Sequence, residues 1–140
     1  MRYVLDTNVI VAGMRSPTGA SAALLDGALR GEFAILLSVA LTLEYEAVCC
    51  DPAHRIISGL SEEDVRTVIS AICAVAEPVI ARFLWRPQLR DPADEMVLET
   101  AINGNADALV TFNRRDFGEV PRRFGIDLLA PKDALMRIHA

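Results

Sequence analysis

The 140-residue sequence has few of the residues that build cross-linked or zinc-bound folds. Its three cysteines, Cys49, Cys50 and Cys73, are an odd number without C-x-x-C spacing. They suit reduced thiols in the core of a cytosolic protein better than a disulfide framework. The two histidines, His54 and His139, have no ligand-like spacing to each other or to a cysteine. We therefore expect no zinc site, and we place both histidines on the surface, with His54 in a loop.

Long apolar runs are also missing. The longest uncharged stretches, such as residues 33–43, are well short of the roughly 20 apolar residues that span a bilayer. The first residues reach Asp6 without the apolar segment that is typical of an export signal. We predict a cytoplasmic protein without a membrane span.

Lysine is nearly absent, since 13 of the 14 basic residues are arginine, and 19 acidic residues give a formal net charge of −5. This charge argues against bulk attraction to duplex DNA, although it does not exclude nucleic acid. The P-loop, the dinucleotide fingerprint and the G-x-S-x-G elbow are absent as well. A cysteine hydrolase is disfavoured because the helix pattern buries Cys49 and Cys50, the only thiols near a histidine.

What is present is material for one hydrophobic core, because 52% of the residues are apolar and no linker or repeat interrupts residues 1–140. Short apolar runs alternate with segments of helical periodicity, which predicts an α/β fold with three layers, α/β/α, around a mostly parallel sheet. The predicted strands are residues 3–5, 33–37, 108–112 and 126–129. The predicted helices are residues 21–30, 38–50, 61–75, 92–103 and a last one that starts near residue 131.

Two acidic residues of the first half stand where ligands bind in such folds, beyond the carboxyl ends of the strands. Asp6 directly follows the first predicted strand, and its alternative role is that of a turn or helix cap. Glu44 has apolar residues three and four positions away on both sides, so we expect it to face inward. The alternative for Glu44 is a structural salt bridge with an arginine.

Three acidic residues of the second half are predicted near the same edge. Asp91 caps the helix over 92–103, and Asp94 lies in its first turn at the head of the buried stripe, with Glu95 turned toward solvent. Asp116 follows a strand end by three residues, and its alternative role is to cap a helix before Phe117.

Carboxylates gathered at one edge without a lysine repel one another unless cations neutralise them. Such hard oxygen ligands suit Mg²⁺ or Mn²⁺, which bind phosphate oxygens. A nuclease and a phosphatase for small phosphate esters both use this chemistry. Arg114 and Arg115, next to Asp116, favour the polymer as substrate, although a surface arginine can also simply be solvated.

Four segments together resemble the PIN-domain nucleases, in particular the bacterial and archaeal branch that holds the VapC-type toxins and their relatives. They are V-L-D-T-N-V at 4–9, L-E-Y at 43–45, D-P-A-D-E at 91–95 and A-D-A-L-V-T-F-N-R-R-D-F at 106–117. The match in order and spacing covers nearly the whole chain. It implies a Rossmann-like PIN fold and an endoribonuclease that depends on Mg²⁺ or Mn²⁺.

The resemblance also assigns roles to residues. It implies an acidic quartet, an additional acid at Asp91 and polar support for the carboxylates. It further implies a homodimer and, for toxin members, a small antitoxin whose tail fills the groove. The alternative is a PIN-like module that binds RNA or protein without cutting, but such a module has no reason to keep uncompensated acids. The quartet is Asp6, Glu44, Asp94 and Asp116, and the supporting residues are Asn8, Thr111 and Asn113.

Overall fold

A computed structural model of the chain describes residues 1–82 and 88–140 and contains a five-stranded sheet in the order β3-β2-β1-β4-β5. All four strand pairs are parallel, with Tyr3 of the central strand beside both Ile35 and Ala108. The fold prediction of an α/β protein with a mostly parallel sheet is thereby confirmed. The strands are β1 (Arg2–Leu5), β2 (Ala34–Leu37), β3 (Glu77–Pro78), β4 (Ala108–Val110) and β5 (Asp127–Leu129).

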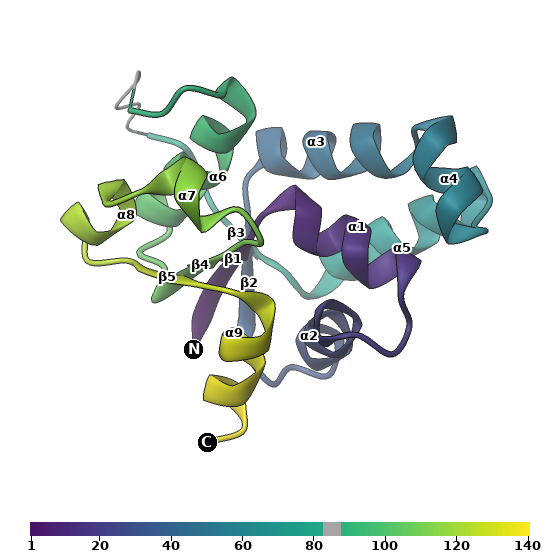
Figure 1. Cartoon of the computed structure of the whole chain (residues 1–140), viewed down its shortest axis with the longest axis horizontal. Coiled ribbons are helices and arrows are strands. Elements are labelled where there is room, and N and C mark those ends of the chain that lie inside the picture. The colour runs from purple at the N-terminus through teal and green to yellow at the C-terminus, as the bar shows by residue number, and fades with distance from the viewer. Residues whose placement is uncertain (83–87) are drawn as a thin grey trace.

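Helices cover the sheet, with α6 packed on β1, β2 and β4, α5 on β2, and α9 on β5 (Figure 1). α1 packs against both α2 and α3, and α3 also contacts α6. The helices are α1 (Thr7–Arg15), α2 (Ala20–Leu29), α3 (Val39–Cys49), α4 (Pro52–Ser58), α5 (Glu62–Val75), α6 (Pro92–Asn103), α7 (Arg114–Phe117), α8 (Val120–Arg123) and α9 (Pro131–Ile138).

Several elements were not predicted. α1 begins directly after Asp6, where the sequence shows only an apolar run, and α4 begins at Pro52, shortly after the end of the helix predicted over residues 38–50. Proline is well tolerated in the first turn of a helix, so Pro52 starts α4 two residues after Cys50, the C-cap of α3. His54 therefore lies in α4, and its placement in a loop was wrong. β3 escaped prediction because it has only two residues, one of them Pro78.

The cysteines are three free thiols with different exposure. Cys49 is buried in the core and Cys50 is half-buried, whereas Cys73 is exposed on α5. The prediction of core cysteines is thus wrong for Cys73. No helix among the described ranges, 1–82 and 88–140, has both the length and the apolar character needed to cross a membrane.

Three hydrogen bonds fix the carboxyl edge of the sheet, where β1 and β4 end side by side. The backbone N–H of Asp6 donates to the carbonyl of Val110 at 2.8 Å. The buried hydroxyl of Tyr45, on α3, donates to the carbonyl of Leu5. The hydroxyls of Ser38 and Thr100 share a buried hydrogen bond of 2.9 Å that joins the start of α3 to α6. The elements that carry the candidate acids are therefore held to one another by direct contacts.

Candidate active site

Asp6 leaves the end of β1 and caps α1, so it has both the strand-end position and the capping role considered for it. Its side chain is buried, and its two oxygens accept hydrogen bonds of 2.7 Å, Oδ1 from the backbone N–H of Thr7 and Oδ2 from the hydroxyl of Thr111. Burial raises the pKa of Asp6, the two hydrogen bonds oppose that rise, and the charges of Asp116 and Asp91 add to it.

Thr111 is the centre of a small polar network at the end of β4. Its hydroxyl oxygen accepts from the backbone N–H of Asn113 at 3.0 Å and from the Asn8 amide at 3.4 Å, while it donates to Asp6. The Asn8 side-chain oxygen in turn accepts from the backbone N–H of Phe112 at 3.4 Å. Thr111 thus holds one oxygen of Asp6 directly, while the Asn8 side chain and the Asn113 backbone hold Thr111.

Asp91 and Asp94 stand at the head of α6. Asp91 caps the helix by accepting from the backbone N–H of Ala93 at 2.9 Å, as predicted. Asp94 is half-buried in the first turn. Burial and the nearby charges of Asp6, Asp91 and Asp116 raise the pKa of Asp94 from 3.8 to about 6. Four carboxylates from β1, α6 and α7 are therefore electrostatically coupled.

Glu95 does not turn toward solvent as predicted, because only 4% of its surface is exposed. Its Oε1 accepts from the backbone N–H groups of Gln88 and Leu89 at 2.6 and 2.7 Å. Within the described part of the chain, its Oε2 is buried without a hydrogen-bond partner. Glu95 fastens the loop before Asp91 to α6. The burial of Glu95 could not be predicted from the helical periodicity, because the loop that contains Gln88 and Leu89 covers a side of α6 that the pattern assigns to solvent.

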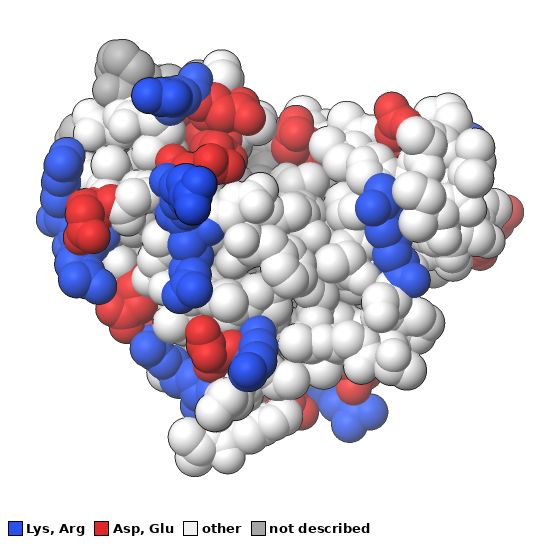
Figure 2. All heavy atoms as spheres, viewed as in Figure 1, with Lys and Arg blue, Asp and Glu red and all other residues white. Residues whose placement is uncertain are grey.

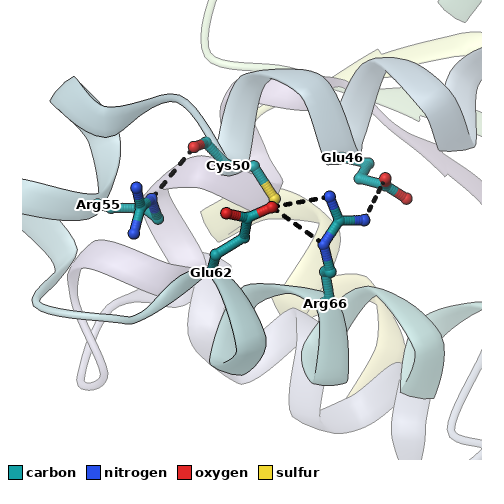
Figure 3. Close-up of polar contacts among 5 residues, drawn as sticks. All are labelled: Glu46, Cys50, Arg55, Glu62 and Arg66. Atoms are coloured by element: carbon teal, nitrogen blue, oxygen red, sulfur yellow. Dashed lines mark hydrogen bonds and ion pairs between the residues drawn. The ribbon is translucent and has the colours of Figure 1, made fainter.

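Glu44 and Asp116 complete the set. Glu44, on α3, is half-buried, and its neighbours Ala40 and Ala47 are exposed, so it lies at the rim rather than in the core. It makes no ion pair with any cation that the structure describes. The arginine-bound glutamate of α3 is instead Glu46, which accepts from Arg66 at 2.5 Å (Figure 3).

Asp116 is exposed within α7. The residue at the N-cap position of that helix is Asn113, so the capping role considered for Asp116 is wrong.

One cleft of about 590 Å³ brings the predicted acids together. A neighbouring cleft of about 610 Å³ shares three of them and is also lined by Arg90 and Arg115, whereas Arg114 lines neither. Figure 2 shows acidic side chains gathered over the region of α6 and α7 with basic ones beside them. The residues of the first cleft that carry the prediction are Asp6, Asn8, Glu44, Asp91, Asp94, Asn113 and Asp116.

The donor set of this cleft consists of carboxylate and amide oxygens, which are the ligand types of Mg²⁺ and Mn²⁺. Across residues 1–82 and 88–140, no three His, Cys, Asp or Glu side chains lie close enough together to hold one ion. The donor types of the cleft thus fit a hard divalent cation, but the carboxylates are farther apart in this structure than a shared ion requires. Sequence reasoning missed two further residues of the cleft, Arg15 and His54, because the wall that they form arises from the contact between α1 and α4.

The comparison with known proteins places the chain in a family. Its fold is similar to that of a chain in the crystal structure of VapBC2 from Rickettsia felis bound to a DNA fragment from their promoter. The TM-score is 0.61, with 17% identity over 93% of this chain and 98% of that chain. No curated protein matches the sequence. A family model described as PIN domain matches residues 2–115, which extend from β1 into α7 and include four of the five acids. The chain therefore belongs to the PIN domain family.

Proposed function

We propose that this PIN domain is a metal-dependent endoribonuclease that hydrolyses phosphodiester bonds of RNA. PIN domains are generally nucleases that use divalent metal ions. The observation that carries the proposal is the coupling of Asp6, Asp91, Asp94 and Asp116 at one cleft, which raises the pKa of Asp94 to about 6. Carboxylates gathered at one cleft repel one another and destabilise the folded chain unless cations bind them, so their presence together indicates a use.

The ion would be held by Asp6, Glu44, Asp94 and Asp116, with Asp91 as an additional acid. When bound, such an ion lowers the pKa of a coordinated water and neutralises phosphate oxygens.

Thr111, supported by Asn8 and Asn113, keeps Asp6 oriented toward the cleft. Hydrolysis by water would leave a 5′-phosphate and a 3′-hydroxyl. Arg115 and Arg114 at the outer edge would contact the phosphates of the approaching strand. The hydrogen bonds of Thr111 with the Asp6 side chain and the Asn113 backbone support this arrangement.

The fold similarity to a VapBC2 chain supports a role as the toxin of a toxin-antitoxin pair. In this proposal a small antitoxin covers the acidic cleft, and the active form is a homodimer. A short upstream reading frame for a DNA-binding protein would agree with the pairing, and co-purification of its product would test it.

Cleavage of end-labelled single-stranded RNA tests the main proposal. We expect fragments with Mn²⁺ or Mg²⁺ and none with EDTA, loss of cleavage in Asp94→Asn and Glu44→Gln, and full cleavage in Glu63→Gln, which removes an exposed acid of α5. Cleavage that persists with EDTA or in Asp94→Asn would contradict the proposal.

Two other outcomes would favour the alternatives. Binding of RNA without metal-dependent cleavage would identify a non-cleaving module. Hydrolysis of a small phosphate ester such as p-nitrophenyl phosphate, without cleavage of RNA, would identify a phosphatase.

A further inference from the structure

The wall of the cleft formed by α1 and α4 carries Arg15, a cationic side chain that has no role in the proposed hydrolysis. Arg15 is the last residue of α1, and Asp6 caps the first turn of the same helix. Both side chains line the cleft of about 590 Å³. A helix rises about 1.5 Å per residue, so the two positions are separated by roughly 13 Å along the axis of α1. Arg15 thus stands within the same cleft as the carboxylates but well away from Asp6.

His54 orients this arginine. An Nη2 proton of Arg15 is donated to Nδ1 of His54, which α4 places against the end of α1. A guanidinium group can only donate, so Nδ1 acts as the acceptor and the imidazole proton lies on Nε2. The contact holds Arg15 without cancelling its charge, because the partner is a neutral ring nitrogen.

The charge of Arg15 is also uncompensated by acids. Among the described residues it forms no ion pair, although five carboxylates line the same cleft. Some arginines of the chain differ in this respect, since Arg66 is bound by Glu46 and Glu62, and Arg30 by Asp26. The cleft therefore has a region of carboxylates and, apart from it, the guanidinium group of Arg15, which His54 orients.

Binding and cleavage of an RNA strand require both the carboxylates and a cationic side chain. Carboxylates without bound ions repel its phosphates, whereas a guanidinium fork binds phosphate oxygens through paired hydrogen bonds. We propose that Arg15, oriented by His54, binds a backbone phosphate of the RNA other than the one that is cleaved, and thereby sets the register of the strand across the cleft. This inference rests on the proposed nuclease function and adds a substrate-positioning residue to it.

Binding of a fluorescent single-stranded RNA oligonucleotide in EDTA tests the inference without any cleavage. We expect Arg15→Ala to weaken binding several-fold and to reduce the slope of log Kd against log salt by about 0.7, the value for one phosphate contact to a single strand. Arg15→Lys keeps the charge and should keep the slope. The control Arg30→Ala removes an exposed arginine that pairs with Asp26 on α2, and it should bind as the unmodified chain does.

His54 provides a second test. If His54 acts only by orienting Arg15, His54→Ala weakens binding less than Arg15→Ala does, and the double variant binds no worse than Arg15→Ala. In cleavage assays Arg15→Ala should raise KM for long RNA with little change in kcat. The change in KM should disappear for oligonucleotides too short to reach Arg15, which a purely structural role of Arg15 would not produce.

The outcomes separate this inference from the function that it rests on. Unchanged affinity and salt slope in Arg15→Ala, with normal RNA binding by the unmodified chain, would overturn the inference and leave the nuclease proposal standing. Absence of both RNA binding and cleavage in the unmodified chain would overturn the nuclease proposal itself. If Arg15→Ala lowers the melting temperature, Arg15→Gln, which keeps a donor for His54, replaces it, and an unchanged salt slope in that variant overturns the inference.

Discussion

Asp94 is the residue whose ionisation should be most visible in solution. Its pKa of about 6 in the folded chain lies above the ordinary 3.8, so the folded chain binds more protons than the unfolded chain between these two values. The free energy of unfolding therefore falls as the pH rises from about 4 to about 6. Above pH 6 the carboxylate is charged in both states, and its destabilising effect is fully present.

The first prediction is that Asp94→Asn flattens this pH dependence and raises the melting temperature of the metal-free protein at pH 7.5. The reason is that the neutral amide no longer repels Asp6, Asp91 and Asp116. Cleavage should fall by about 100-fold or more, because Asp94 would hold the ion that neutralises the phosphate oxygens, and losing such charge stabilisation typically costs this much. Thermal melting from pH 4 to 8 and an RNA cleavage assay measure both effects. A loss of stability as large as that of a core cavity would show that Asp94 is structural.

Individual residues also show how far the sequence could specify the cleft. Asp6 and Asp94 were predictable because one follows an apolar run and the other begins an apolar helical stripe. Glu95 was not, because the loop at 88–89 packs over it from outside the helix. The positions of Arg15 and His54 depend on the packing of α1 against α4, which leaves no local pattern.

At the scale of elements, the attachment of α3 to β1 matters most for the cleft. Tyr45 is fully buried, and its hydroxyl donates to the carbonyl of Leu5, the residue before Asp6. Glu44, which precedes Tyr45 in the chain, lies at the cleft. One hydrogen bond thus ties together two elements that each supply a candidate acid.

The second prediction concerns Tyr45→Phe, which leaves the Leu5 carbonyl without its partner in the core. We expect a loss of about 1–3 kcal/mol in the free energy of unfolding, measured by urea titration, and reduced cleavage. Tyr3→Phe is the matched control, because the Tyr3 hydroxyl donates to the carbonyl of Ala134 on α9 at 3.2 Å. The control should lose stability and keep its activity. Equal cleavage by the two variants would show that the contact of Tyr45 does not position the site.

Elements with strong local signals were predictable from the sequence, and those with ambiguous signals were not. The α5 helix has a complete capping box at Ser61 and Asp64, and α6 has a capping aspartate followed by proline. In α1, by contrast, three consecutive β-branched residues, 9–11, follow the strand, and their local preference does not indicate a helix. The helix forms because Asp6 caps it and its buried side packs on α2 and α3.

At the scale of the whole molecule, the acidic cluster should make stability depend on divalent cations. The third prediction is that Mn²⁺ or Mg²⁺ raises the melting temperature, since an ion that binds only the folded chain stabilises it by about 2.7 kcal/mol at a hundredfold excess over its Kd. The increase should fade as the pH falls through about 6, because protons then compete for Asp94. Calorimetry at pH 5 and pH 7.5 measures it.

Variants locate the ion responsible for that increase. Asp6→Asn and Glu44→Gln should reduce it, while Glu63→Gln should leave it intact because Glu63 is exposed on α5, outside the residues that line the cleft. An increase that is the same in all three variants would place the ion elsewhere on the molecule.

The hydrogen bond from Thr111 to Asp6 joins residues that are 105 positions apart in the chain. The central strand β1 therefore emerges from the ribosome well before its neighbour β4 and the acids of α6 and α7. At 5–20 residues per second, that delay is roughly 5–20 s. A nascent chain that ends before Thr111 has no assembled carboxylate cluster. Whatever activity the cleft has begins only after the segment that carries Asp116 has been synthesised.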